Sequence, residues 1–549
     1  KVKLFLGIKK PLFREVRGAS LIGCVSMRYN RSMNQKCYIT TAIPYANAAP
    51  HIGTAMDYLY GDILLRYQLL RGNDAKMSIG TDEHGIKVQQ KAETNGKTPQ
   101  QFVDDLQPEF NKMRAALDMN FGVDITDATK PLVEQDFNEQ NIISVRTSDS
   151  EHVRLVQDIW RRLDEAGVIY KSRYEGWYCT GCEAYYTETE THDNNYICPI
   201  HNKPYEKLSE ENYYLKVSAF TDRIRNFIKD AVVPEFRGKE LLEMIKDGAR
   251  DVSISRPSDK LSWGVPVPGD ESQVMYVWID ALSNYITALG YPDDDWHSDF
   301  WPANVEIVGK DILRFHAIIW PAMLMALGLE LPKKLMVHGF INVDGVKMSK
   351  SIGNVVSPLA IIDDYGVDAF RYYFVAHVPT FEDGDFTWEK FENAYNGELA
   401  NDLGNLVARV AAMIRKYFDG NLAVVDETNE LNDAAETLLG DYKVSMDGLD
   451  LNSALNAITK YVHELNQYIE QSAPWKVNKI EDEAERMQRQ VEIFSTLVNG
   501  LLLVAKYVSP FMPNTAYVIH DTFSHDEIPA ETPIMFPKKY LHTAEPTHK

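Results

Sequence analysis

A short segment near the start of the chain limits the possible folds more than any other part of the sequence. Residues 37–42 are β-favouring and mostly apolar, a loop follows over 43–50, and a helical pattern runs over 51–70. A strand, a tight loop and a helix in this order open an α/β unit built on a parallel sheet. We therefore expect an α/β fold, with a further strand at 76–80 and helices at 98–117 and 151–166.

The chain is too long for one compact core, because it has 549 residues and single cores stop growing near about 250–300 residues. Residues 174–215 are rich in Tyr, Thr, Glu, Asn and Cys and lack a helical period, which indicates a small inserted module. Alternating strands and helices resume from Val274. Residues 391–508 are helical almost throughout, with breaks at Gly420, Asp447-Gly448 and Ala473-Pro474, and this pattern predicts a separate helix bundle.

Composition narrows the possible partners. The most apolar run that we identify, residues 317–331, is short for a membrane span and contains Pro321 and Glu330, so we expect a buried helix there and no membrane partner. Lys and Arg total 57 against 79 Asp and Glu, a net charge of −22. This balance argues against a non-specific nucleic-acid binder, whose surface is usually basic, but it leaves room for RNA held by local basic patches and base stacking.

Two motifs suit a nucleotide. Pro50-His51-Ile52-Gly53-Thr54 stands where a strand turns into a helix, and a helix N-terminus offers free N–H groups and partial positive charge to phosphates. His51 can donate to a phosphate oxygen, although such a motif alone is more often only a turn. Lys347-Met348-Ser349-Lys350-Ser351 places two lysines three residues apart, as expected of a mobile clamp on an anion.

The cysteines point to a metal. Cys179-x-x-Cys182 and the later Cys198-Pro199-Ile200-His201 provide three thiolates and one imidazole, the ligand set and spacing of a tetrahedral zinc site. The surrounding module has little core of its own, so the zinc is expected to be structural. An odd total of five cysteines over a long chain is no disulfide framework and favours a reducing compartment.

Taken together, the two nucleotide motifs resemble the paired signature of class I aminoacyl-tRNA synthetases, His-Ile-Gly-His and Lys-Met-Ser-Lys-Ser. The second motif matches in full, whereas Thr54 replaces the last histidine of the first. The resemblance implies a Rossmann-type catalytic domain in which His51, Thr54, Lys347 and Lys350 are catalytic, with Mg²⁺ accompanying ATP. Thr54 keeps a hydroxyl but lacks the imidazole, and one lost transition-state donor can cost ~3 kcal/mol.

Further blocks resemble the methionyl-tRNA synthetases in particular, over roughly residues 36–540. They are Thr41-Ala42-Ile43-Pro44-Tyr45-Ala46-Asn47, Gly80-Thr81-Asp82-Glu83-His84-Gly85, Tyr174-Glu175-Gly176-Trp177-Tyr178-Cys179, Tyr276-Val277-Trp278-Ile279-Asp280-Ala281, Gly309-Lys310-Asp311-Ile312-Leu313-Arg314-Phe315-His316 and Val337-His338-Gly339-Phe340. One-zinc members of that family carry the same Cys-x-x-Cys and Cys-Pro-x-His pattern between the two Rossmann halves.

This resemblance implies two small-molecule sites. The implied ATP-binding residues are His51, Gly53, Lys310, His338, Met348, Ser349 and Lys350. The implied methionine-binding residues are Ile43, Tyr45, Asp82, Trp278, Ala281, Tyr285, Ile312 and His316, with Asp82 holding the ammonium. The chemistry agrees, because a polarisable thioether favours aromatic contacts and a buried carboxylate suits an ammonium. Any single one of these aromatic residues, taken alone, would be a core residue.

The helical part carries a third implied site. Asn405 and Arg409 are four residues apart and therefore share one helix face, and Trp475 follows a predicted helix-start corner at Ala473-Pro474. These three residues match positions that read the CAU anticodon of tRNA(Met) in the family. Arg and Trp can stack on unpaired bases while Asn contacts a Watson–Crick edge.

The sequence thus predicts a methionine–tRNA ligase that forms methionyl-adenylate from ATP and L-methionine. Its expected organisation is 1–35 basic extension, 36–165 first Rossmann half, 166–235 zinc-bearing insertion, 236–340 second Rossmann half, 341–388 lysine-loop segment and 389–549 helical anticodon-binding domain. Two alternatives stay open: a catalytically impaired tRNA-binding homologue, and another class I synthetase. The second needs room for a large editing domain, which residues 166–274 do not offer.

Two expectations concern the ends of the chain. Residues 1–35 are basic, with Glu15 as their only acidic residue. An upstream extension before a start at Met27 or Met33 is favoured over an organelle transit peptide, so we expect a cytoplasmic protein. The chain ends soon after Phe536-Pro537, without the additional tRNA-binding domain that often mediates dimerisation in relatives, and we therefore expect a monomer.

Overall fold

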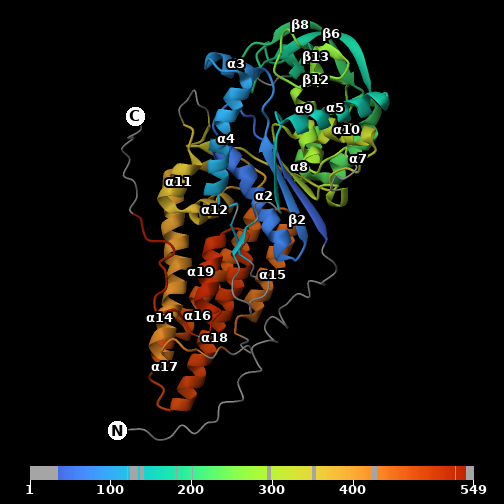
Figure 1. The fold of residues 1–549 in the computed structure, drawn as a ribbon. Helices are drawn as coiled ribbons and strands as arrows, with labels where there is room; N and C mark the ends of the chain where they lie inside the picture. The colour runs from blue at the N-terminus through green and yellow to red at the C-terminus, as the bar shows by residue number, and fades with distance from the viewer. Residues whose placement is uncertain are drawn as a thin grey trace.

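The computed structural model describes residues 35–119, 121–123, 134–136, 141–180, 184–186, 188–200, 202–293, 298–348, 354–422, 424, 430–525 and 527–539. An α/β body with an inserted β module lies at one end of the molecule, and a long helical bundle extends from it (Figure 1). This arrangement confirms the expected α/β fold with a C-terminal helical domain.

A six-stranded parallel sheet is the centre of the α/β body. Its strands, in spatial order, are β5 (Ile142–Arg146), β2 (Asp74–Thr81), β1 (Lys36–Thr41), β14 (Val305–Gly309), β15 (Leu335–His338) and β9 (Val232–Val233). The chain moves outward from β1 to β2 and β5 on one side, and later occupies the other side with β14 and β15. The strand order therefore reverses between β1 and β14, and ligands bind beyond the carboxyl ends of the strands at such a point.

Helices cover both faces of this sheet. They are α2 (Ile52–Leu70), α4 (Pro99–Ala116), α5 (Ser150–Glu165), α7 (Thr221–Ala231), α8 (Glu235–Met244), α9 (Val277–Thr287), the π-helical turn η3 (Phe315–Ile319) and α10 (Trp320–Leu327), while α3 (Ile86–Thr94) packs on α4. Alternate residues of β1 enter different cores: Cys37 and Ile39 pack on the α2 side, whereas Tyr38 packs on the side of α5, α9 and α10. The predicted helices at 51–70, 98–117 and 151–166 are confirmed to within one residue at each end.

The module inserted between the two halves of the sheet is mostly antiparallel. Its larger sheet has the order β10 (Val252–Ser253), β8 (Glu206–Leu215), β6 (Ile169–Cys179) and β7 (Ala184–Tyr186), and a smaller one joins β11 (Ser255–Pro257), β13 (Asp270–Met275) and β12 (Pro266–Val267). The described helices within 174–215 are limited to the short α6 (Glu188–His192), which agrees with the missing helical period. The 3-10 turn η1 (Val217–Phe220) leads back toward α7.

A connecting segment follows β15. It contains β16 (Ile341–Val343), β17 (Val346–Lys347), α11 (Pro358–Tyr365), α12 (Val367–Ala376) and β18 (Gly384–Phe386). Asp344 and Gly345 have φ angles of 52° and 74°, so two left-handed residues close the hairpin between β16 and β17. Asp-Gly is a preferred pair for this turn, which places Lys347 on the returning strand.

The helical domain consists of α13 (Trp388–Ala394), the π-helical stretch η4 (Tyr395–Gly404), α14 (Asn405–Phe418), α15 (Asn432–Asp447), α16 (Leu451–Ser472), α17 (Pro474–Val477), α18 (Glu483–Val508) and α19 (Pro513–Phe523). The predicted breaks at Gly420, Asp447-Gly448 and Ala473-Pro474 coincide with helix ends. The sequence pattern did not indicate η4.

Within the part of the chain that the structure describes, the helix long and apolar enough to cross a membrane is α18, whereas the predicted run at 317–331 falls on a shorter apolar helix. However, 67% of the apolar window of α18 is buried inside the structure. Such burial is that of a core helix in a bundle. Residues 317–327 of this run form part of η3 and α10, and most of their side chains are buried, as expected.

A buried arginine joins the α/β body to the helical domain. Arg371 of α12 donates to the carbonyl oxygens of Leu117, Pro510 and Phe511 at 3.0, 2.8 and 2.6 Å, and its Nη2 lies 2.6 Å from the carboxylate of Asp62 on α2. One continuous hydrophobic core extends from β1 and α2 into α14, α16, α18 and α19. A short antiparallel hairpin, β3 (Phe121–Val123) with β4 (Glu134–Asp136), follows α4 along the chain, and we assign it no role.

Candidate active site

The residues expected to bind small molecules gather at the carboxyl edge of the parallel sheet. His51 lies beyond β1, Asp82 directly after β2, Lys310 directly after β14, and His338 is the last residue of β15. These four strands are adjacent in the sheet. The structure therefore brings together segments that are far apart in the sequence, at the place where doubly wound sheets bind ligands.

Aromatic rings form one wall of this edge. Trp278 of α9 stacks on Phe315 of η3 with ring centroids 3.9 Å apart and planes at 9°, and it meets His316 edge-on at 5.9 Å. Tyr285, seven residues along α9, has its ring centroid 5.7 Å from that of His316. Ala281 lies between them on the same face of the helix. These contacts group four of the residues expected to line an apolar side-chain pocket.

The hydrogen bonds of His316, at the polar end of this wall, define where its ring carries a proton. Nδ1 of His316 lies 3.0 Å from the carbonyl oxygen of Ile312, and Nε2 lies 2.7 Å from the Tyr285 hydroxyl. A carbonyl can only accept, so Nδ1 carries the proton and Nε2 accepts from Tyr285. Burial lowers the pKa of His316 to about 4, so the ring is neutral at physiological pH.

The loops after β1 and β2 form the opposite side. Tyr45 and Asp82 make an isolated parallel bridge, with the Ala46 amide 2.7 Å from the Asp82 carbonyl and the Asp82 amide 2.9 Å from the Pro44 carbonyl. A Cβ at Gly80 of β2 would lie 2.3 Å from the Val145 carbonyl oxygen and 3.0 Å from the Ile43 side chain, so glycine allows both neighbours to come this close to the strand. Ile43, Tyr45 and Asp82 are thus held next to one another.

At the start of α2, the side chain of His51 caps its own helix. Its Nδ1 accepts a hydrogen bond from the Gly53 amide at 3.0 Å. A Cβ at Gly53 would lie 2.8 Å from Cε1 of this ring, so only glycine leaves the ring its position. Because Nδ1 accepts, the neutral ring carries its proton on Nε2, where it can donate to an anion. Thr54 is buried in the same turn, and His51 is the exposed polar side chain here.

Two lysines approach one aromatic ring beyond β15. Nζ of Lys310 and Nζ of Lys347 each lie 4.5 Å from the centroid of Phe340. Lys310 also pairs with Asp383 at 2.7 Å, whereas Lys347 is exposed on β17 and Met348 packs against the hydrophobic core. The other predicted residues of this motif, Ser349 and Lys350, lie outside the described residues.

His338 is paired with an acidic residue of α2. Its Nε2 lies 2.7 Å from Oδ1 of Asp57. Burial would lower the pKa of His338, but the neighbouring carboxylate outweighs it and the pKa is raised. The carboxyl end of β15 therefore holds a histidine that takes up a proton more readily than usual, close to the two lysines.

The predicted metal ligands are described in part. Cys179 at the end of β6 and Cys198 are both fully buried and belong to one small cluster with Tyr205. The backbone turns tightly at Cys198, which accepts from the Asn202 amide and donates to the Lys203 carbonyl, both at 2.8 Å. The other two predicted ligands, Cys182 and His201, lie outside the described residues. Among the residues that the structure describes, no group of three metal-binding side chains is found.

The predicted RNA-binding residues lie in the helical domain. Asn405 begins α14 and is exposed, and Arg409 lies one turn further along with its guanidinium 2.7 Å from Glu470 of α16. Trp475 in α17 is 40% exposed. Arg409 and Trp475 are thus both near the C-terminal end of α16, on a domain separate from the sheet edge (Figure 1).

Comparison with known proteins agrees with this division. The family "tRNA synthetases class I (M)" matches residues 37–203 and 190–411, and "Anticodon binding domain of methionyl tRNA ligase" matches residues 420–536. The methionine–tRNA ligase of Clostridium acetobutylicum is 43% identical over 494 residues, which cover 88% of this chain and 72% of that protein. The chain belongs to the methionyl-tRNA synthetases of class I.

Other relatives extend this result. The methionine–tRNA ligase of Streptomyces coelicolor is 40% identical, with 88% of this chain and 89% of that protein covered. The crystal structure of Mycobacterium tuberculosis methionyl-tRNA synthetase bound by methionyl-adenylate has a TM-score of 0.81 and 34% identity, covering 92% of this chain and all of that one. The Rossmann-type fold expected of this synthetase is therefore confirmed, together with its anticodon-binding domain.

Sequence reasoning missed three acidic residues around the site of this synthetase. Asp57 pairs with His338, Asp280 binds two histidines, and Glu306 of β14 is buried with Oε1 accepting from the Trp320 indole at 3.0 Å. Burial raises the pKa of Glu306 to about 8. The available signal for each was an acidic residue inside a strand or an apolar stretch of helix. This signal does not identify the partners, because they come from elements that are distant in the sequence.

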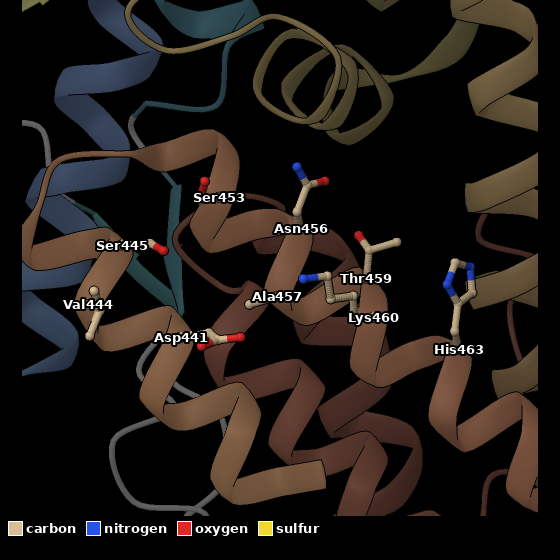
Figure 2. Close-up of a pocket in the computed structure, with 9 residues that line it drawn as sticks. All are labelled: Asp441, Val444, Ser445, Ser453, Asn456, Ala457, Thr459, Lys460 and His463. Atoms are coloured by element: carbon tan, nitrogen blue, oxygen red, sulfur yellow. The ribbon is translucent and has the colours of Figure 1, made fainter. Parts of the chain in front are cut away.

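A hollow of about 440 Å³ lies elsewhere in this synthetase, between α15 and α16. Figure 2 shows Asn456, Thr459, Lys460 and His463 of α16 beside Asp441, Val444 and Ser445 of α15. Met446 and Asp447 of α15 line another hollow together with Cys37 at the start of β1, so α15 faces the amino end of the sheet. The hollow in Figure 2 is therefore separate from the candidate active site.

Proposed function

We propose that this chain activates L-methionine with ATP and transfers the methionyl group to the 3′ end of tRNA(Met). The single observation that carries the proposal is the pairing of an aromatic wall around His316 with a capped helix N-terminus at His51, both at the carboxyl edge of one sheet. The first suits an apolar thioether and the second suits phosphates. The matching anticodon-binding domain supports tRNA as the acceptor.

In the first step, the methionine carboxylate attacks the α-phosphorus of ATP and pyrophosphate leaves. Asp82 holds the ammonium, and the wall of Trp278, Tyr285 and His316 takes the side chain. Nε2–H of His51 and the ammonium of Lys347 stabilise charge on the phosphates, with Lys350 and Thr54 proposed to assist. In the second step, a ribose hydroxyl of the terminal tRNA nucleotide takes the methionyl group from the adenylate. Neither step needs a covalent bond to the enzyme.

The nucleotide is proposed to lie along the residues inferred from the family signature. Lys310 lies over the ring of Phe340. His338 is paired with Asp57 of α2, the helix that begins directly after His51. Gly53 leaves the backbone open, and Met348 and Ser349 belong to the lysine loop. Mg²⁺ is the cation expected with ATP, where it neutralises phosphate charge.

We also propose one structural zinc per chain, held by Cys179, Cys182, Cys198 and His201. The buried thiols of Cys179 and Cys198 in one cluster, with a tight turn at Cys198, support it. Thiolates and imidazole are the ligands that zinc prefers in structural sites. Zinc bound there would stabilise a module whose own cluster is small.

Amino-acid-dependent exchange of pyrophosphate into ATP tests the proposed function. Purified protein is assayed with each standard amino acid in turn, and exchange with methionine alone is expected. Folded, zinc-loaded protein that exchanges with no amino acid but still binds tRNA(Met) would favour the catalytically impaired homologue, an alternative supported only by Thr54. Exchange with leucine, valine or isoleucine would favour another class I synthetase.

Two further expectations remain proposals about the protein in its cell. A cytoplasmic location is supported by the reducing environment that thiolate ligands need, and an organelle is the alternative if residues 1–35 act as a transit peptide. A monomer stays a prediction, which light scattering on the eluted protein would test.

A further inference from the structure

A buried carboxylate links the two sides of the proposed methionine site. Asp280 on α9 is 1% exposed, and each of its oxygens faces one histidine ring. Oδ2 lies 2.8 Å from Nδ1 of His84, and Oδ1 lies 3.0 Å from Nε2 of His152 on α5. An ionised carboxylate only accepts, so both ring nitrogens donate to it. Burial raises the pKa of Asp280, but the two histidines outweigh this and bring it to about 2.

Helix α9 presents different residues on two faces. Trp278, Ala281 and Tyr285 follow the three- and four-residue spacing of one face and contribute to the pocket wall. Asp280 lies on another face, which turns toward α5. His152 fixes that face at a second point, since its Nδ1 lies 2.8 Å from the Thr287 hydroxyl at the end of α9.

His84 belongs to the loop that carries the proposed ammonium-binding residue, Asp82. Trp263 also fixes this loop. The ring of His84 meets Trp263 edge-on with centroids 5.0 Å apart, and the Trp263 indole donates to the Glu83 carbonyl at 2.6 Å. The Glu83 side chain is anchored separately by Arg146 at 2.9 Å. The hydrogen bond from His84 to Asp280 directly links this loop to helix α9.

We propose that Asp280 is a positioning residue that sets which side-chain length the methionine site accepts. Through His84 it fixes Asp82 relative to Trp278, Ala281 and Tyr285 on α9. The separation between the ammonium anchor and the pocket wall then defines the distance that a substrate must span. This inference rests on the proposed function, because it assumes that methionine is the substrate and that Asp82 binds its ammonium.

The test uses full-length protein and pyrophosphate exchange with methionine and with norvaline, which has a shorter side chain. Wild-type exchange with methionine is measured first, because its absence would reject the proposed function and not this inference. Asp280→Asn keeps the shape but removes the charge, and His84→Leu removes the donor. Both are expected to raise the KM for methionine about tenfold, to leave kcat and the KM for ATP within about twofold, and to reduce the preference for methionine over norvaline.

Two matched variants separate positioning from general stability. His84→Asn places an amide N–H where Nδ1 lies and is expected to restore the wild-type KM and preference. His152→Ala also breaks a buried bond to Asp280, but leaves the His84 link in place, and is expected to lower the melting temperature with little change in preference. Unchanged KM and preference in Asp280→Asn would overturn the proposal. Equal effects of His84→Leu and His152→Ala on preference would overturn it too.

Discussion

The hydroxyl of Tyr285 lies 2.7 Å from Nε2 of His316, inside the aromatic wall of the site. With Nε2 unprotonated, the Tyr285 hydroxyl donates to it, whereas protonation of Nε2 would reverse the bond and leave the Tyr285 proton in need of another acceptor. The ring is buried, and its pKa is lowered to about 4. The site therefore has one polar atom pair whose state does not change near neutral pH.

A pH dependence of stability follows from this lowered pKa. In the unfolded chain the ring takes up a proton below about pH 6.5, while in the folded chain it does so only near 4. The contribution of the neutral ring is complete above 6.5 and is lost as pH falls toward 4, by up to about 3 kcal/mol. Denaturant unfolding of wild type and His316→Asn at several pH values should show their stability difference shrinking in this window. A constant difference would contradict the buried neutral ring.

His51 is expected to serve both the helix and the reaction. His51→Ala should lower kcat for exchange about 100-fold, as loss of one transition-state donor does, and should cost about 1 kcal/mol of stability through loss of the N-cap. His51→Asn is the matched control, since Asn caps helices well but does not reach as far as Nε2. We expect it to keep the stability and lose the rate. Wild-type kcat in the alanine variant would refute a role in charge stabilisation.

The zinc site can be tested by comparing two buried cysteines, one a proposed zinc ligand and the other a residue of the sheet core. Cys198→Ala should reduce zinc from one per chain to background in elemental analysis and lower the melting temperature, because the module has few other stabilising contacts. Cys37 is also buried, and burial raises the pKa of its thiol to about 12, so it stays protonated in the sheet core. Cys37→Ala should keep its zinc. Full zinc content in the Cys198 variant would exclude that ligand.

In the helical domain, Arg409 is expected to affect charging but not activation. Arg409→Ala should lower kcat/KM for tRNA aminoacylation about 10- to 100-fold, the loss typical of one stacked base, while pyrophosphate exchange changes less than twofold. Its ion pair with Glu470 is partly exposed and contributes less than about 1 kcal/mol. Glu470→Gln should therefore leave stability unchanged and charging at least as efficient. A parallel fall of exchange and charging in Arg409→Ala would argue against anticodon contact.

Local sequence signals predicted the elements that depend on local physics. Helical periodicity predicted α4, whose start carries the Thr98–Gln101 capping box, and Ala473-Pro474 marked the end of α16. Family motifs then identified Trp278, Tyr285 and His316, which do lie together. The partners of Asp280 could not be predicted in this way, because His84, His152 and Asp280 approach one another only after three distant segments have packed. The π-helical stretch η4 also lacked a signal, since its apolar spacing resembles that of an ordinary helix.

The burial of Arg371 affects how the two parts of the molecule unfold. Its guanidinium is bound at once to α2, to the end of α4 and to the turn between α18 and α19. Separating the helical domain from the sheet would part this charge either from the Asp62 carboxylate and the Leu117 carbonyl or from the Pro510 and Phe511 carbonyls, which is costly for a buried guanidinium. The catalytic and helical parts should therefore melt in a single cooperative transition, and a protein cut between them would yield two fragments that each expose a broken core.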